Sequence, residues 1–175
     1  MKIRLSALSE TAFWNAAGVS LPGYDVQGMR AATAARPAWV HFGAGNIFRA
    51  FTAALQQRLL NQGLTDTGII AADTFDVDNI REIYGRFDCL TLSVTLLPDG
   101  TTGRELIGSV AEALVAQPSE AADWARLRAI FRDPGLQMVS FTITEKGYAL
   151  NSLAAADMER GPAAPRHAMR SEEHT

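Results

Sequence analysis

The sequence predicts an α/β fold: a parallel β-sheet with flanking helices and an inserted antiparallel hairpin. Short apolar runs of strand length alternate with helical patterns between residues 38 and 143. A glycine turn joins the first run to the first long helix, and one alternating segment leads into a tight turn. Alternation of strands and helices favours a parallel sheet, because parallel neighbours need a crossover connection.

The bulk composition excludes several classes of protein. The chain has 175 residues, 47% hydrophobic and 20% charged, which is enough apolar material for one core. Its net charge of −3 gives no basic field for nucleic acid or an anionic membrane. No stretch has the apolar length of a membrane span and the N-terminus lacks a signal-peptide pattern, so we expect a cytoplasmic protein. Cys89 is the only cysteine, and its apolar surroundings favour a buried side chain over a reactive thiol.

The first elements predict a strand–helix–strand unit. Residues 1–37 form a lead-in with one short helix at 9–17. Residues 38–42 are an apolar run that stops at a glycine, as in a buried parallel strand. Residues 46–63 have a helical pattern that ends in glycine, and residues 68–73 are a second strand. Four apolar side chains are expected on one face of that helix: Phe48, Phe51, Leu55 and Leu59.

The second half predicts a hairpin and one more helix–strand pair. Residues 77–84 suit a short helix, residues 89–97 alternate like a strand, and residues 105–111 are expected to return as its hairpin partner. Residues 119–132 form a helix with Ser119 as N-cap, ended by Asp-Pro-Gly. Residues 136–143 are another strand. An antiparallel hairpin inside this series is an insertion into a Rossmann-type pattern.

The main functional signal is the glycine turn between the first strand and the first helix. Glycines allow a tight turn and close approach of a pyrophosphate, while the helix N-terminus offers free N–H groups. The bare pattern leaves a simple tight turn open as an alternative, and the usual fingerprint has Gly or Ala where Phe48 stands. The candidate cofactor-binding residues here are Gly43, Ala44, Gly45, Asn46, Ile47, Phe48 and Arg49.

Asp73 is the candidate ribose ligand. It ends the second apolar run, 28 positions after Gly45, against about 20 in the usual fingerprint. A carboxylate there accepts hydrogen bonds from ribose hydroxyls and repels a 2′-phosphate, which favours NAD over NADP. The alternative is that Asp73 caps the helix near residue 77, and Asp76 competes for both roles.

A third group follows the last strand. Thr144, Glu145 and Lys146 are expected to face the cofactor cleft, because ligands collect at the carboxyl ends of parallel strands. Glu145 is the candidate catalytic residue of this chain, as a proton relay, although it could also orient the nicotinamide ribose. Lys146 could instead pair with Glu145 at the surface. His41 lies mid-strand and is expected to be a core histidine. The pattern contains no Ser-His-Asp set and no metal-ligand cluster.

Several separated motifs occur in an order that resembles the polyol-specific long-chain dehydrogenases, a family that includes mannitol dehydrogenases and fructuronate (mannonate) oxidoreductases. The segments that carry the resemblance are residues 21–25, 40–46, 49–50, 144–148 and 161–169. Many members have histidines where this chain has Phe48 and Phe51. The Gly-Asn-Ile-Phe-Arg form of residues 45–49 resembles the fructuronate-reductase side of the family, with mannitol or arabinitol oxidation as the alternative.

The resemblance implies an NAD-dependent enzyme acting on a small polyol or sugar acid without a metal. It implies an NAD(P)-binding domain over 38–150 and the start of a helical substrate domain over 151–169. The general base would be a lysine of that second domain, at a position this chain does not contain, so the chain alone is expected to be inactive. Glu145 resembles a family glutamate near that lysine.

The end of the chain and the glycine turn each allow a further interpretation. Residues 170–175 resemble a translated sequencing-adapter fragment, so we interpret them as a non-native tail, with the native gene continuing beyond residue 169. A non-catalytic nucleotide-binding module or a methyltransferase is the alternative of another class, since a Gly-x-Gly turn also cradles adenosylmethionine. The motif after the last strand favours the dehydrogenase.

Overall fold

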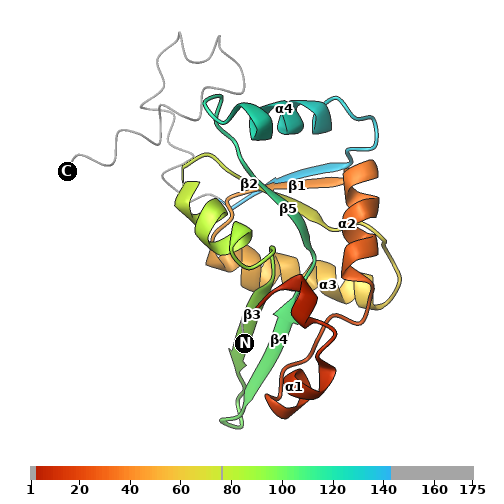
Figure 1. Ribbon diagram of the computed structural model, residues 1–175, viewed down its shortest axis with the longest axis vertical. Helices are drawn as coiled ribbons and strands as arrows, with labels where there is room; N and C mark the ends of the chain where they lie inside the picture. Colours follow the sequence, from red (N-terminus) through yellow and green to blue (C-terminus); the bar gives the residue numbers. More distant parts are fainter. Residues whose placement is uncertain (1–2, 76, 143–175) are drawn as a thin grey trace, which may run out of the picture. The chain divides into compact units, whose positions relative to one another are not determined.

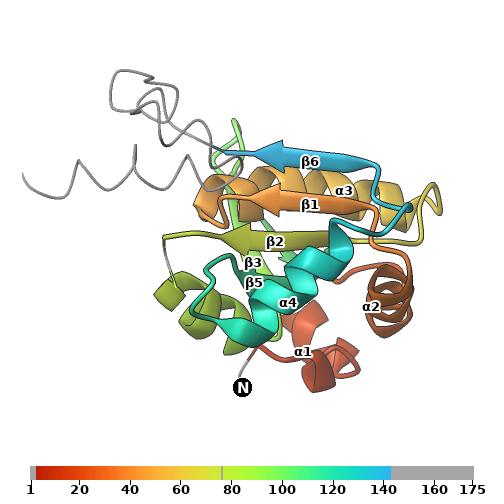
Figure 2. The same cartoon turned by 90° about the horizontal axis from the view of Figure 1, so that it is seen from above.

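The main sheet has four parallel strands. The computed structural model describes residues 3–75 and 77–142 (Figure 1), and its strands lie in the order β5–β2–β1–β6 (Figure 2). Strand β1 pairs with β2 on one side and β6 on the other, and β2 also pairs with β5, all in parallel. The predicted parallel α/β sheet is confirmed. Its strands are β1 (Trp39–Phe42), β2 (Ile69–Asp73), β5 (Val110–Val115) and β6 (Met138–Phe141).

Helices cover both faces of this sheet. The π-helical turn η2 (Phe48–Thr52) runs directly into α3 (Ala53–Asn61) on one face, and α4 (Ala121–Ile130) lies on the opposite face (Figure 2). A second π-helical segment, η3 (Asn79–Gly85), follows β2 and packs into the same apolar cluster as η2 and α3. Within the described residues, no helix has the length and apolar character that crossing a membrane requires.

The lead-in contains more helix than the sequence predicted. The expected short helix is present as α1 (Thr11–Ala16), after a 3₁₀ turn η1 (Leu5–Ala7). The structure adds α2 (Val26–Ala35), whose first turn is capped by the Asp25 carboxylate accepting from the Gln27 N–H at 3.0 Å. Helix α2 buries one face and contacts β5, so the lead-in is part of the folded unit.

The inserted hairpin is present, but the predicted return strand was wrong. Strands β3 (Thr91–Leu96) and β4 (Thr102–Ile107) pair antiparallel, so residues 105–111 are not one strand. After two intervening residues, Gly108 and Ser109, β5 starts in the main sheet. The Ile69 N–H already donates to the Ser109 carbonyl at 2.9 Å, and a Cβ on Gly108 would meet three side chains at 3.2–3.3 Å. Close packing at this glycine therefore divides the segment.

The predicted apolar face of the first long helix was also wrong. Phe48 is fully buried, but Phe51, Leu55 and Leu59 are exposed, Phe51 by 64%. The reason is the π-helical turn over 48–52, which inserts extra residues per turn and rotates all later positions away from the face of Phe48. The face that is buried instead contains Ala53, Ala54, Gln56, Gln57 and Leu60.

The predicted cap of α4 was wrong as well. The helix begins after Glu120, whose side chain makes no cap hydrogen bond, and the Ser119 hydroxyl donates instead to the Gln117 side chain at 3.3 Å. Asp123 in the first turn accepts from the Val115 N–H at 2.8 Å, which ties the helix to the end of β5. The helix type and approximate extent agree with the prediction.

Gln57 joins α3 to the junction between the hairpin and β5. This fully buried side chain donates to the Glu105 carboxylate at 2.8 Å and the Leu106 carbonyl at 3.0 Å, and its Oε1 accepts from the Gly108 N–H at 2.8 Å. Buried polar groups that lose a partner carry their full desolvation cost. The Gln57 side chain is therefore one of the contacts that hold the hairpin on the body of the fold, beside the backbone hydrogen bonds of Ser20 with Arg104 and Leu106.

We expect Gln57→Leu to lower the free energy of unfolding by about 2–4 kcal/mol, because the Gly108 N–H and Leu106 carbonyl lose this partner while buried. Urea denaturation measures the loss. Gln62→Leu, at an exposed position one turn further on, is the matched control and should change stability by less than about 0.5 kcal/mol. Equal effects of the two substitutions would contradict the role assigned to Gln57.

Candidate functional site

The glycine turn lies where the strand order reverses. From β1 the chain builds β2 and β5 on one side and then returns to place β6 on the other side of β1. Connections that leave in opposite directions open a crevice at the carboxyl ends of the two strands, where ligands of such sheets bind. Gly43 follows β1 at this edge of the sheet, and a helix starts directly after Gly45.

The two glycines of the turn serve different purposes. Gly43 has φ +98°, a conformation that favours glycine, and its N–H donates to the Ala72 carbonyl at 3.0 Å. Gly45 has an ordinary φ, and a Cβ built on it would meet no protein atom within 4 Å. Turn geometry thus explains Gly43, whereas the space in front of Gly45 fits the approach of a ligand to the backbone.

The peptide groups of Ala44 are held from two other elements. Its N–H donates to Asp73 Oδ2 at 3.0 Å, from the end of β2. Its carbonyl accepts from Asn79 Nδ2 at 2.9 Å and from the Tyr84 hydroxyl at 2.8 Å, both on η3. Burial raises the pKa of Tyr84 well above its ordinary value, so its hydroxyl remains a donor. The turn is therefore fixed in place by side chains of η3 and β2.

Asp73 lies at the carboxyl edge, as predicted, and has a second contact. Its other oxygen accepts from the Phe75 N–H at 2.9 Å, which organises the chain just beyond β2. These two hydrogen bonds orient the carboxylate beside the turn. Asp76, its competitor in the sequence, lies outside the described residues.

Arg49 lies across the turn. Its guanidinium donates to Asn79 Oδ1 at 3.2 Å and to the Asn46 side chain, and it sits 5.8 Å from the centroid of the Tyr84 ring. Since neutral amide oxygens hold it, an anionic phosphate could replace them as a stronger charge-assisted partner. Arg49 is thus positioned beside the turn with its positive charge available.

The remaining residues of the turn differ in what they expose. Phe48 is fully buried and stacks on His41, with ring centroids 4.2 Å apart and planes 9° from parallel, so only its backbone can face a ligand. Ile47 is 71% exposed. Ala44 is buried, as its hydrogen bonds require. Thr144, Glu145 and Lys146 lie outside the described residues.

His41 is an interior side chain, as predicted, and Cys89 is partly buried against the apolar cluster of η3 and α3. His41 is 2% exposed and lies 2.8 Å (Nδ1) from Ser140 Oγ. Burial lowers the pKa of His41, partly opposed by a hydrogen bond with the Gly43 backbone. Burial raises the pKa of the Cys89 thiol to about 11, so the reactive thiolate is scarce at neutral pH.

Asn79 and Tyr84 are site residues that the sequence did not reveal. They reach Ala44 from 35 and 40 positions along the chain and belong to no glycine fingerprint. The only local signal was that a short helix follows β2. Within residues 3–75 and 77–142, no three His, Cys, Asp or Glu side chains are grouped so that they could hold a metal ion.

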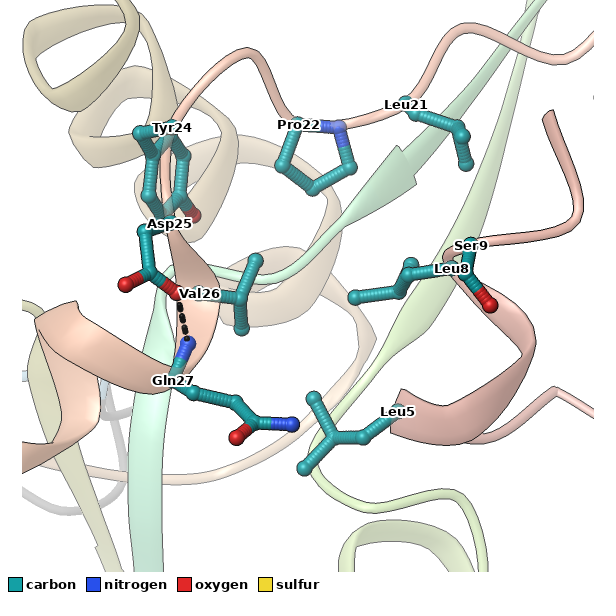
Figure 3. Close-up of a pocket in the computed structure, with 9 residues that line it drawn as sticks. All are labelled: Leu5, Leu8, Ser9, Leu21, Pro22, Tyr24, Asp25, Val26 and Gln27. Atoms are coloured by element: carbon teal, nitrogen blue, oxygen red, sulfur yellow. Dashed lines mark hydrogen bonds between the residues drawn. The ribbon is translucent and has the colours of Figure 1, made fainter.

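A surface hollow of about 360 Å³ lies away from this turn, where the lead-in meets the start of α2 (Figure 3). Its wall combines aliphatic side chains with polar ones but has no cationic group, and its carboxylate, Asp25, is already bound to the Gln27 N–H as the cap of α2. Nothing in this lining suits a nucleotide phosphate. We therefore place the candidate site at the glycine turn.

Because the pKa of His41 is lower in the folded chain than its ordinary 6.5, the folded state binds fewer protons than the unfolded state in mild acid. Stability from neutral His41 is complete above about pH 6.5 and is lost as the pH falls through the folded pKa. His41→Gln cannot titrate. Urea midpoints at about pH 7.5 and about pH 5.5 should therefore fall further for the natural chain than for the variant. Parallel declines would contradict this, since carboxylates titrate in both proteins.

Two known oxidoreductases are similar to this chain in sequence. No protein-family model matches the chain. The chain is 42% identical to D-mannonate oxidoreductase of Thermotoga maritima over 176 residues, which cover 97% of this chain and 32% of that protein. It is 31% identical to the polyol:NADP oxidoreductase of Gluconobacter oxydans, covering 82% of this chain and 28% of that protein.

One solved structure of a dehydrogenase is also similar to this chain. The fold is similar to mannitol 2-dehydrogenase of Pseudomonas fluorescens, solved as a ternary complex with NAD and D-mannitol, with a TM-score of 0.67 and 27% identity. That similarity covers 85% of this chain and 28% of the other. The chain thus spans about a third of the length of the curated relatives it matches.

Proposed function

We propose that this chain, which belongs to the polyol-specific long-chain dehydrogenases, is the cofactor-binding part of an NAD-dependent oxidoreductase. The enzyme would interconvert a linear polyol or hexonate, a small-molecule substrate, and its keto form. The relative named D-mannonate oxidoreductase, at 42% identity, favours a hexonate of the fructuronate-reductase type. The similarity to a mannitol 2-dehydrogenase structure keeps mannitol or arabinitol oxidation as the alternative.

The observation that carries the proposal is the fixed turn with open space in front of Gly45. Its position at the reversal of strand order is where dinucleotides bind in such sheets. The N–H groups of Asn46, Ile47 and Phe48 start a helix and have no acceptor four residues earlier within it, so they suit a pyrophosphate. Arg49 would add a charge-assisted contact.

Asp73 is the proposed ligand of the adenosine ribose. Its carboxylate is oriented by the N–H groups of Ala44 and Phe75, and each of its oxygens can accept further hydrogen bonds from ribose hydroxyls. The same negative charge would repel the 2′-phosphate of NADP, so we propose NAD as the cofactor.

Chemistry would be divided between cofactor and protein. NAD, when bound, accepts or returns a hydride at the secondary-alcohol carbon of the substrate. The residues of this chain would bind and orient the dinucleotide. Glu145, on the segment after β6, is proposed to relay a proton, and Thr144 and Lys146 to line the cofactor cleft, by their resemblance to the family motif.

Fluorescence titration of the 175-residue chain with NADH, NADPH and adenosylmethionine tests this proposal. We expect NADH to bind and NADPH to bind at least about tenfold more weakly, because Asp73 repels the 2′-phosphate. Asp73→Asn keeps an acceptor oxygen for the Ala44 N–H but removes the charge, so it should narrow the gap between the two nucleotides.

Asp99→Asn is the matched control, since Asp99 is a fully exposed carboxylate on the hairpin turn. It should leave the preference for NADH unchanged. If the chain binds adenosylmethionine but does not bind NADH, the proposed dehydrogenase function is rejected. An Asp73→Asn variant with the natural preference would reject the assigned role of Asp73.

A further inference from the structure

A partly buried polar contact links the two strands that flank the crevice. His41 on β1 and Ser140 on β6 are paired in register. The Trp39 indole N–H donates to Ser140 Oγ at 2.7 Å, and His41 Nδ1 lies 2.8 Å from the same oxygen. The Ser140 hydroxyl therefore links Trp39 and His41 of β1 to β6. Strand β6 is the neighbour of β1 on the side opposite β2.

The same imidazole reaches the glycine turn. It hydrogen-bonds with the backbone of Gly43, two residues further along the chain. Since the Gly43 N–H already donates to the Ala72 carbonyl, the acceptor for the imidazole is the Gly43 carbonyl. The ring also stacks on Phe48, the first residue of η2. His41 thus contacts the residue that opens the turn and the residue at which η2 starts.

We propose that His41 is a positioning residue for the nucleotide turn, holding the Gly43 carbonyl from the side of β6 and thereby aiming the N–H groups of residues 45–48. This inference rests on the proposed function. Asp73, Asn79 and Tyr84 hold Ala44 from β2 and η3. His41 and Ser140 supply the hold from the other side of β1.

The hydrogen bonds separate this role from simple core filling. A phenylalanine at position 41 would fill the same space and stack on Phe48, but it would hold neither the Gly43 carbonyl nor the Ser140 hydroxyl. Positioning therefore predicts a defect confined to the turn, whereas core filling predicts little change in His41→Phe.

The test compares His41→Phe with Val40→Ala in the 175-residue chain. Val40 is fully buried on the same strand but packs into the cluster on the α4 side, so its substitution loosens the core without touching the turn. The first readout is amide hydrogen exchange of the peptide covering residues 43–48, without nucleotide. His41→Phe should exchange about tenfold faster there than Val40→Ala at matched global stability.

The second readout is the Kd for NADH. We expect His41→Phe to raise it about tenfold relative to Val40→Ala, the effect of one or two lost hydrogen bonds. His41→Gln keeps a polar group able to hydrogen-bond and should recover part of the loss. Ser140→Ala removes the hydroxyl beside His41 and should give an intermediate defect; it also carries the comparison if His41→Phe does not fold.

The outcomes separate the two proposals. Exchange at residues 43–48 that is no faster than in Val40→Ala overturns the role of His41, whatever NADH does. If residues 43–48 exchange faster in the variants but the natural chain does not bind NADH, His41 positions the turn and the proposed function is rejected. Faster exchange with a weaker Kd supports both.

Discussion

The buried backbone of Ala44 is the constraint on which the rest of the site depends. A peptide group inside a protein must find partners for its N–H and C=O, and strand pairing cannot supply them at a turn. Here the Asp73 carboxylate takes the N–H, while Asn79 and Tyr84 take the carbonyl. The N–H and C=O of this one residue therefore tie the turn after β1 to both β2 and η3. The same Asp73 is proposed to contact ribose, so turn geometry and cofactor choice are coupled through one side chain.

Most of the parallel sheet could be predicted from the sequence, because short apolar runs ended by glycine or aspartate are clear local signals, as at residues 38–43 and 68–73. Helix α2 was missed because Gly28 interrupts a segment with few large apolar residues. The division between β4 and β5 was missed because alternation continues across it. Only the side chains that crowd Gly108, from distant parts of the chain, reveal why the strand must stop there.

The candidate site, like the fold, could be predicted from the sequence only in part. The turn and Asp73 could be predicted, since both stand next to strand ends within one βαβ unit. Asn79, Tyr84 and the reach of His41 to Ser140 could not, because these contacts join residues 35 to 99 positions apart. The outward rotation of Phe51 results from a π-helical turn that periodicity of 3.6 residues does not anticipate. The loop with Thr144, Glu145 and Lys146 remains a prediction.

The position of β6 at the edge of the sheet has a consequence for handling the chain. Within the described residues β6 has a neighbour on one side only, and Met138 and Phe141 on it are exposed. An uncovered strand edge with apolar side chains is a template for pairing with another chain, and proteins usually cover such edges or mark them with charge. In the described part of the chain, this edge is therefore the place where pairing with another strand would begin, and Met138→Lys or Phe141→Lys would oppose such pairing.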